Sequence, residues 1–298
     1  MTSTTPNYTV STEFAKQSLL VALHIKQYAG KKEDKKVSKK ARADHAAAED
    51  SGAFQKNLVG KDALEPITKA VSALRAFHGE NSLPWLDEGE RILPSMNYES
   101  YKTEIEGLKD AFETAVRDFT NAWPEIVEKA RGQLGAMFNE SDYPADIRDK
   151  FGCTVRFLPL PTAEFLVDVS PAEREILRQH VEANLEHAQR MANADLYQRL
   201  HTSVKSMADR LAGYDKDPET GKVSGVFRDS LVENLRDLVA LVPRLNFSDD
   251  PELERIRKQV EGELCEHDAQ TLRDDAGTRE RVAESAEGIA ARLGEFMK

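Results

Sequence analysis

The sequence has little cysteine, few aromatic residues and no long apolar run. Cys153 and Cys265 are the two cysteines among 298 residues, and aromatic residues make up 7% of the chain. Two distant cysteines in unrelated contexts exclude a disulfide framework and a cysteine-based zinc motif, and they fit a reducing compartment. No stretch approaches the roughly 20 apolar residues of a membrane span, and residues 1–6 lack the features of a secretory signal. We therefore expect a cytoplasmic protein that has no membrane partner.

Charged residues, in contrast, are abundant and unevenly distributed. They make up 31% of the chain, and the formal net charge is −11. Residues 1–60 contain ten lysines and arginines against six acidic residues, so this segment carries +4 and leaves −15 for residues 61–298. A basic segment on an acidic body can orient an approaching partner.

Two long segments, 98–138 and 171–211, have apolar residues at spacings of three and four, which predicts amphipathic helices. A run of about 40 residues would be about 60 Å long, which is typical of spacers, assemblies and binding surfaces rather than of compact enzymes. Pro124 removes a backbone donor and is expected to break the first helix near Trp123. The second helix begins with a capping box, Ser-Pro-Ala-Glu at residues 170–173, and ends at Gly213.

The other segments predict a mainly α fold with a small antiparallel β-unit (α+β). Apolar residues alternate with other residues in segments 153–160 and 165–169, and Pro159 and Pro161 lie at the turn between them. This pattern predicts a β-hairpin at a sheet edge. The chain would reverse there, so that the two long helices run antiparallel. A strand is expected at residues 19–25 and a structured loop at residues 83–94. We expect further helices at residues 35–50, 63–77 (ended by Gly79), 226–245, 251–264 and 271–298.

These elements favour a single elongated domain over residues 1–298. Its basic N-terminal head would comprise residues 1–95. A long helical arm, with the hairpin at about 153–169, would comprise residues 96–213, and the C-terminal helices residues 214–298. The long apolar stripes are those of helices that pair, as in a coiled coil.

The densest basic cluster lies at residues 31–42. Lysine contacts phosphate as a mobile charge, which gives affinity for nucleic acid without base readout. The alternative is a solvated helix face, partly neutralised by Glu33 and Asp34. The nearby aromatics are Tyr28 and Phe54, so no stacking platform is evident. We assign to a nucleic-acid-binding site Lys31, Lys32, Lys35, Lys36, Lys39, Lys40 and Arg42, and expect Lys32, Lys35, Lys36, Lys39 and Arg42 on one side of a helix.

No motif in the sequence indicates catalysis or a metal. His180 and His187 are two helical turns apart, about 10 Å, which is too far to share one ion. Cys265 and His267 point to different sides of a helix. P-loop, dinucleotide-binding, nucleophile-elbow and kinase signatures are missing from the sequence. We therefore expect a non-enzymatic protein with no cofactor and no metal.

Several short motifs resemble a known family. They are Leu83-Pro84-Trp85, Gly89, Arg91-Ile92-Leu93-Pro94, Tyr98, Tyr101, Leu134-Gly135, Phe138, Asp142-Tyr143-Pro144, Phe157, Pro159, Pro161 and Phe165. On these residues, which cover about 14–169, the chain is similar to an uncharacterised helical family encoded by bacteriophages and integrative mobile elements. The resemblance implies a gene near recombination genes and a MoxR/CobS-like AAA+ ATPase, and a place in the cytoplasm of a host cell. It supplies no catalytic residues.

Two functional hypotheses follow. The first is a phage-type helical protein that forms homo-oligomers and contacts DNA or an acidic partner through residues 31–42, with a role in recombination or replication. The second is an adaptor or partner subunit of a MoxR-type AAA+ ATPase that does not bind nucleic acid. Binding to oligonucleotides, or co-purification with the ATPase, distinguishes them.

Overall fold

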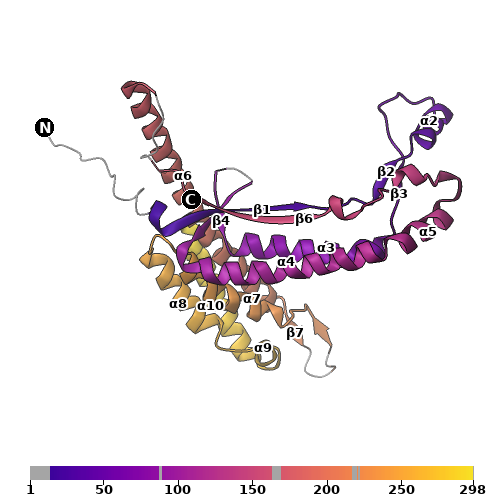
Figure 1. Ribbon diagram of the computed structural model, residues 1–298. Helices are drawn as coiled ribbons and strands as arrows, with labels where there is room; N and C mark the ends of the chain where they lie inside the picture. Colours follow the sequence, from indigo (N-terminus) through magenta and orange to yellow (C-terminus); the bar gives the residue numbers. More distant parts are fainter. Residues whose placement is uncertain (1–13, 87–88, 163–168, 217–219, 221, 298) are drawn as a thin grey trace. The chain divides into compact units, whose positions relative to one another are not determined.

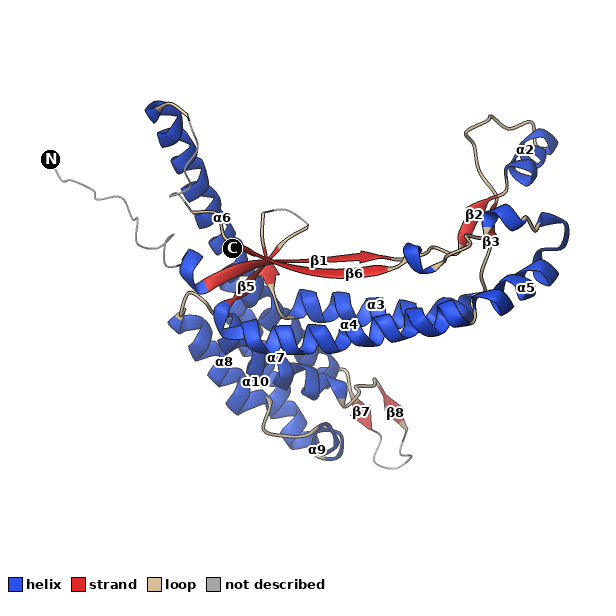
Figure 2. Ribbon diagram, viewed as in Figure 1, coloured by secondary structure: helices blue, strands red, loops and turns tan. Residues whose placement is uncertain are grey.

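The computed structural model describes residues 14–86, 89–162, 169–216, 220 and 222–297. It is mainly helical with a small antiparallel sheet, which confirms the predicted fold class (Figures 1 and 2). The chain forms two compact units. Unit 1 comprises Met1–Ala22, Asn81–Glu99 and Phe157–Lys298, and unit 2 comprises Leu23–Glu80 and Ser100–Arg156. Each unit is described by itself below.

The largest sheet has the strand order β4-β5-β1-β6, with β4 at Leu83–Pro84, β5 at Arg91–Pro94, β1 at Ser18–Lys26 and β6 at Gly152–Pro159. The predicted strands at residues 19–25 and 153–160 are thus confirmed. Residues 83–94, expected as a loop, instead supply two short strands. Strand β5 pairs antiparallel with β1 on one side and with β4 on the other. Apolar residues set both registers, since Ile92 of β5 lies opposite Leu20 of β1 and opposite Leu83 of β4. Proline ends both strands, where a missing donor costs little.

The second half of the predicted hairpin, residues 165–169, lies almost entirely outside the described residues. In the sheet, the neighbour of β6 is β1. A strand from an early part of the chain therefore pairs with β6, which local alternation did not predict.

The longest helix of unit 1 is α6, Pro171–Ala212, and its predicted start and stop are confirmed. Ser170 Oγ accepts a hydrogen bond from the Glu173 backbone N–H at 3.3 Å, and the Glu173 carboxylate accepts one from the Ser170 N–H at 3.2 Å. This reciprocal pair satisfies two donors that a helix start leaves open. At the other end, Gly213 caps the helix by donating to the Asp209 carbonyl.

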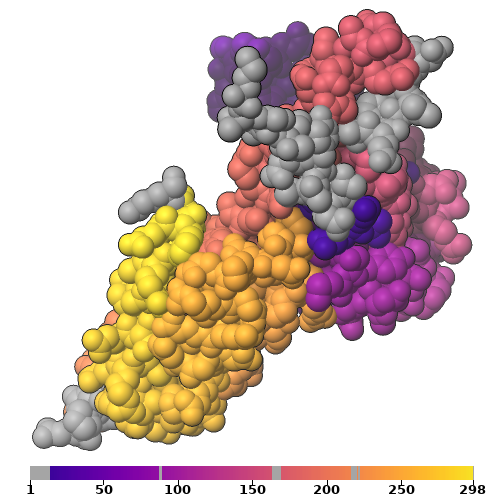
Figure 3. Space-filling view, turned by 90° about the vertical axis from the view of Figure 1, so that its left-hand side faces the viewer, coloured from indigo at the N-terminus to yellow at the C-terminus, as the bar shows by residue number. Residues whose placement is uncertain are grey.

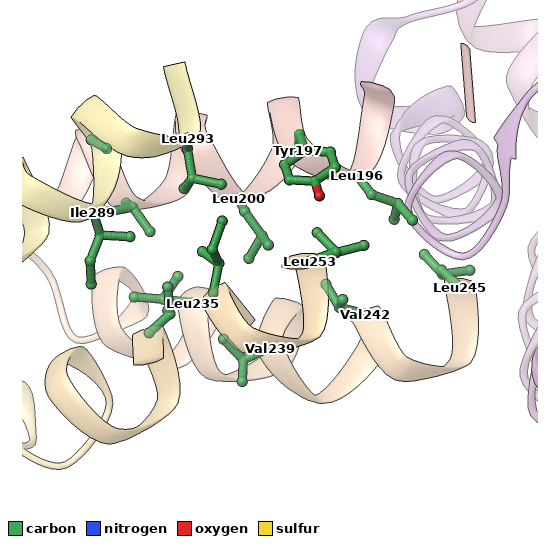
Figure 4. Close-up of a cluster of buried hydrophobic side chains, with 14 of the residues drawn as sticks. Leu196, Tyr197, Leu200, Leu235, Val239, Val242, Leu245, Leu253, Ile289 and Leu293 are labelled. Carbon is green, nitrogen blue, oxygen red and sulfur yellow. The ribbon is translucent and has the colours of Figure 1, made fainter. Parts of the chain in front are cut away.

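The core of unit 1 is formed by α6 together with α7 (Ser230–Leu245), α8 (Pro251–Leu264) and α10 (Ala276–Glu295). From Leu185 onwards one face of α6 is buried. Each fully buried leucine contributes about 1.5–3 kcal/mol relative to exposure. Figure 4 shows the side chains that meet between these four helices: Leu196, Tyr197, Leu200, Leu235, Val239, Val242, Leu245, Leu253, Ile289 and Leu293.

The helix pairing differs from the predicted antiparallel arm. We expected α6 to pair with the first long helix, but α6 packs most extensively on α10, and also on α7 and α8. The first long run belongs, from Ser100 on, to unit 2. The sequence therefore predicted the positions of the apolar stripes correctly. The predicted packing partner of α6 was wrong. Figure 3 shows the outer surface of α8 and α10, coloured orange to yellow.

Two of the predicted helices have different boundaries in unit 1. The segment 226–245 becomes helical only at Ser230. The helix expected at 271–298 is two helices, α9 (Ala269–Asp274) and α10. Asp275 separates them because its carboxylate accepts from the Thr278 N–H at 3.1 Å and starts α10. A hairpin of β7 (Asp215–Lys216) and β8 (Val223–Ser224) lies between α6 and α7 in the chain.

Unit 2 contains α3 (Lys61–Glu80), α4 (Tyr98–Asn121, from Ser100 on) and α5 (Trp123–Leu134). The predicted break in the first long helix is confirmed, since Ala122 separates α4 from α5 and Pro124 lies in the first turn of α5. The predicted cap at Gly79 is wrong, because α3 continues to Glu80. Phe77 packs on Tyr101 at 5.4 Å between ring centroids, which joins the end of α3 to the start of α4.

Among the described residues, no helix combines the length and the apolar character that crossing a membrane would require.

Candidate nucleic-acid interface

The predicted site residues lie on a small module of unit 2 that we call the basic hairpin, residues 31–57. Strand β2 (Lys31–Glu33) pairs antiparallel with β3 (Gln55–Asn57), and α2 (Lys35–Asp44) is inserted between them (Figure 1). Lys32 lies opposite Lys56 in this pairing. The pairing of β2 with β3 therefore fixes the start of α2 and the path of the segment that follows α2.

Local signals define both ends of α2. The Asp34 carboxylate accepts from the backbone N–H groups of Lys36 at 3.0 Å and Val37 at 3.1 Å, an N-cap. The backbone N–H of Val37 is the main cause that lowers the pKa of Asp34. We expected the helix to continue to residue 50, but it ends at Asp44 because Ala46 adopts φ 47°. The Ala47 N–H then donates to the Arg42 carbonyl at 2.9 Å, which is the Schellman pattern.

The inner face of α2 is tied to the rest of the hairpin. Ser38 Oγ donates to the Asp34 carbonyl at 2.9 Å and accepts from the Phe54 N–H at 2.9 Å. The Arg42 guanidinium donates to the Gly52 carbonyl at 2.7 Å. Arg42 was expected beside the lysines, but its side chain instead holds the returning loop.

The outer face of α2 carries four lysines: Lys35, Lys36, Lys39 and Lys40. All four are exposed, and within the described part of the chain none of their ammonium groups has an ion-pair partner. Lys35 and Lys39 are one helical turn apart, as are Lys36 and Lys40, so the four charges cover one side of the helix. Lys31, on β2, is also exposed, and its ammonium group has no ion-pair partner among the described residues.

Lys32, in contrast, belongs to a nearly buried ion network. Its Nζ lies 2.7 Å from Asp142 Oδ1, and Lys56 Nζ lies 2.7 Å from Asp142 Oδ2. Lys56 also donates to the Met137 carbonyl at 2.7 Å and lies 3.7 Å from Asp34. The side chains of Lys56 and Asp142 are 6% and 5% exposed. This network attaches the basic hairpin to residues 137–142 of the same unit.

The network keeps Asp142 ionised. Burial opposes the charged form of this carboxylate, but the ammonium groups of Lys32 and Lys56 outweigh it and lower the pKa of Asp142. The neighbouring Tyr143 donates from its hydroxyl to the Leu58 carbonyl at 3.1 Å and holds the same segment. The sequence did not predict the pairing of Lys56 with Asp142, because these two residues are far apart in the chain.

Phe54 is an exposed aromatic residue on the basic hairpin. The residue is 41% exposed. Its backbone is fixed at both ends, since the N–H donates to Ser38 Oγ and the carbonyl accepts from the Asp34 N–H at 2.9 Å. A fixed, exposed ring near free lysines can stack on a nucleobase.

The histidines and cysteines weighed as metal ligands and nucleophiles are the remaining candidates. In the described part of the chain, no group of three or more His, Cys, Asp and Glu side chains is placed to hold a metal ion. Burial raises the pKa of the Cys265 thiol to about 11 and also raises the pKa of Cys153. Both thiols are therefore protonated at neutral pH and poorly nucleophilic.

Comparison of the chain with models of protein families, with curated proteins and with solved structures gave no match.

Proposed function

We propose that this protein binds nucleic acid through the basic hairpin, in a non-enzymatic role that serves recombination or replication of DNA. The observation that carries the proposal is the outer face of α2, where four exposed lysines have no ion-pair partner among the described residues. Lysines used for local stability usually face a carboxylate, as Lys32 and Lys56 do here. The resemblance to a family encoded near recombination genes supports the same role.

Contact with phosphates explains this arrangement physically. Four ammonium groups that neutralise four phosphates release the condensed counterions, so log K falls with log salt at a slope of about −3.6. Residues 61–298 carry −15 and repel a polyanion. The contact is thereby restricted to the basic hairpin. Lysine carries no base code, so the binding is independent of sequence.

A fluorescence-anisotropy titration tests the proposal. Labelled oligonucleotides, single-stranded and double-stranded, are titrated with the protein at 50 mM and 200 mM salt. The slope above predicts an affinity for double strands about 100-fold lower at the higher salt, and the smaller slope of about −2.8 for single strands predicts a loss of about 50-fold. Absence of binding at 50 mM, or binding that salt does not weaken, would contradict the proposal and favour a protein partner such as the AAA+ ATPase.

Phe54 provides a prediction that separates the two kinds of nucleic acid. F54A is expected to weaken single-strand binding about 5- to 100-fold, since stacking of one base contributes about 1–3 kcal/mol. Double-strand binding should not change, because paired bases are not available for stacking. The comparison of the two titrations is decisive. Equal weakening of both would show that Phe54 acts only through the shape of the hairpin.

Self-association is the second part of the proposal, and the start of α6 supports it. The buried residues of α6 begin only at Leu185, so the first turns of the helix extend beyond the core of their own unit. On these turns Ile176 is 53% exposed, and Leu177 is half-buried. An apolar stripe that continues past its own core suits a second copy of the same helix.

The I176E variant tests this interface. The wild type is expected to elute as a dimer or larger species in size-exclusion chromatography with light scattering, and I176E as a monomer at the same concentration. The fold should persist, because Ile176 lies outside the core. E186K, a charge reversal at an exposed position on the side of the same helix opposite Leu177, is the matched control and should remain oligomeric. A wild type that is monomeric at high concentration would refute this part.

A further inference from the structure

A second charged feature lies in unit 1, remote in sequence from the basic hairpin. A hollow of about 510 Å³ opens between the last turns of α6 and the first turns of α7. Its volume lies within the range of small-molecule sites, about 300–1,000 Å³. The residues that line it are Ser206, Arg210, Val226, Arg228, Ser230, Leu231 and Asn234.

Among the described residues that line it, two carry a positive charge and none carries a negative one. Arg210 comes from α6, and Arg228 from the segment before α7. Neither guanidinium has an ion-pair or hydrogen-bond partner within the residues that the structure describes, although both are exposed. In a chain of net charge −11, two unpaired arginines on one hollow are unexpected.

The carboxylates nearest in sequence are engaged elsewhere. Asp209, next to Arg210, accepts from Lys205 Nζ at 2.9 Å. Asp229, next to Arg228, is held by Arg273 at 2.6 Å. Arg257 of the same unit, by comparison, is paired with Glu254 and Glu261. Asp209 and Asp229 are thus paired with other cations, and neither pairs with Arg210 or Arg228 in the part of the chain that the structure describes.

The remaining lining groups complete a set of donors. Ser206 and Ser230 contribute hydroxyls and Asn234 an amide, while Val226 and Leu231 add apolar surface. Guanidinium groups bind phosphate and carboxylate in a planar, bidentate manner. We propose that this hollow binds a small anionic molecule, one that presents a phosphate or carboxylate group to Arg210 and Arg228. This proposal does not depend on the function proposed for the basic hairpin.

Isothermal titration calorimetry of the full-length protein tests it, with pyrophosphate and citrate as the two probes. We expect saturable binding of one probe, and which one binds identifies phosphate or carboxylate as the recognised group. R210Q and R228Q should each weaken that binding at least 10-fold. R210K should weaken it less than R210Q, because charge is kept while the bidentate geometry is lost. R190Q removes an exposed arginine of α6 outside the hollow and should have no effect.

Three results would overturn the proposal. The first is no saturable binding of either probe to the wild type. The second is equal weakening by R190Q and by R210Q, which would indicate general charge attraction. The third is a loss of oligonucleotide binding in R210Q and R228Q with no change for either probe, which would reassign the arginines to nucleic acid. Since both arginines are exposed, circular dichroism should show that all variants fold.

Discussion

The quadruple variant K35E/K36E/K39E/K40E is expected to abolish oligonucleotide binding at 50 mM salt. It changes the outer face of α2 from four positive to four negative charges, so attraction to phosphate becomes repulsion. The measurement is the anisotropy titration of the wild type, repeated with the variant at up to 100-fold higher protein concentration. Binding that is unchanged, or weakened only a few fold, would refute the assignment of the site to α2.

The variant should fold normally, which makes the result interpretable. Lys35 and Lys36 lie in the first turn of α2, where acidic side chains are favoured by the helix dipole. The four side chains make no hydrogen bond or ion pair in the described part of the chain that the change would break. Circular dichroism is expected to show the wild-type helix content.

A pair of double variants provides the matched control. K36E/K40E reverses two charges on α2, and K102E/K129E reverses two exposed lysines on α4 and α5. Both change the net charge of the protein by the same amount. We expect the first to weaken binding at least 10-fold and to lower the magnitude of the salt slope by about 2. The second should change neither quantity by more than about twofold.

The variant D142N is expected to lower the free energy of unfolding of unit 2 by about 3 kcal/mol, because it leaves the buried Lys56 ammonium without its close counter-charge. Lys32 is 52% exposed, so its share of the effect is small. Urea unfolding followed by the fluorescence of Trp123 measures the effect. This residue donates to the Pro144 carbonyl at 3.2 Å and packs against Tyr143, so it reports on the same segment.

The chain has two tryptophans, so W85F provides a background in which Trp123 is the single probe. D110N, at an exposed position of α4, is the matched control and should change stability by less than about 0.5 kcal/mol. A double-mutant cycle of D142A with K56A isolates the pair, and a coupling energy near zero would contradict the network as a source of stability.

The same network predicts how acid affects unit 2. The pKa of Asp142 is lower in the folded state than the ordinary value of about 3.9. Its stabilising contribution is therefore complete above about pH 4 and is lost as the pH falls through the lower folded-state pKa. D142N should remove this dependence, so the stability difference between wild type and variant should shrink below pH 4. A difference that stays constant down to pH 2 would contradict the assignment.

Elements with a strong local signal were predicted accurately from the sequence. The capping box at Ser170 and the stop at Gly213 bound α6 as expected, and Pro124 marks the break between α4 and α5. These signals act through backbone groups a few residues away, so no knowledge of the fold is needed to interpret them. The strands β4 and β5 were not predicted, because strands of two and four residues, respectively, are too short to show an alternating pattern.

The candidate site was predicted only in part, because charge alone does not reveal which lysines are free. Lys35, Lys36, Lys39 and Lys40 remain unpaired on α2 among the described residues, as a nucleic-acid site requires. The assigned residues Lys32 and Arg42 are occupied, the first by Asp142 and the second by the Gly52 carbonyl. Nothing in the spacing of residues 31–42 separates the two groups.

The sequence by itself determined the helical composition of this protein, the helix ends that carry a capping box or a proline, and the concentration of lysine near residue 35, since each follows from periodicity, capping chemistry or counting. Only the tertiary structure decided that α6 packs on α10, that Lys56 and Asp142 bury their charges together, and that Arg210 and Arg228 line a hollow with no carboxylate among its described residues. The physical reason is distance along the chain. Packing and ion pairing depend on which distant residues meet in space, and local patterns carry no record of that.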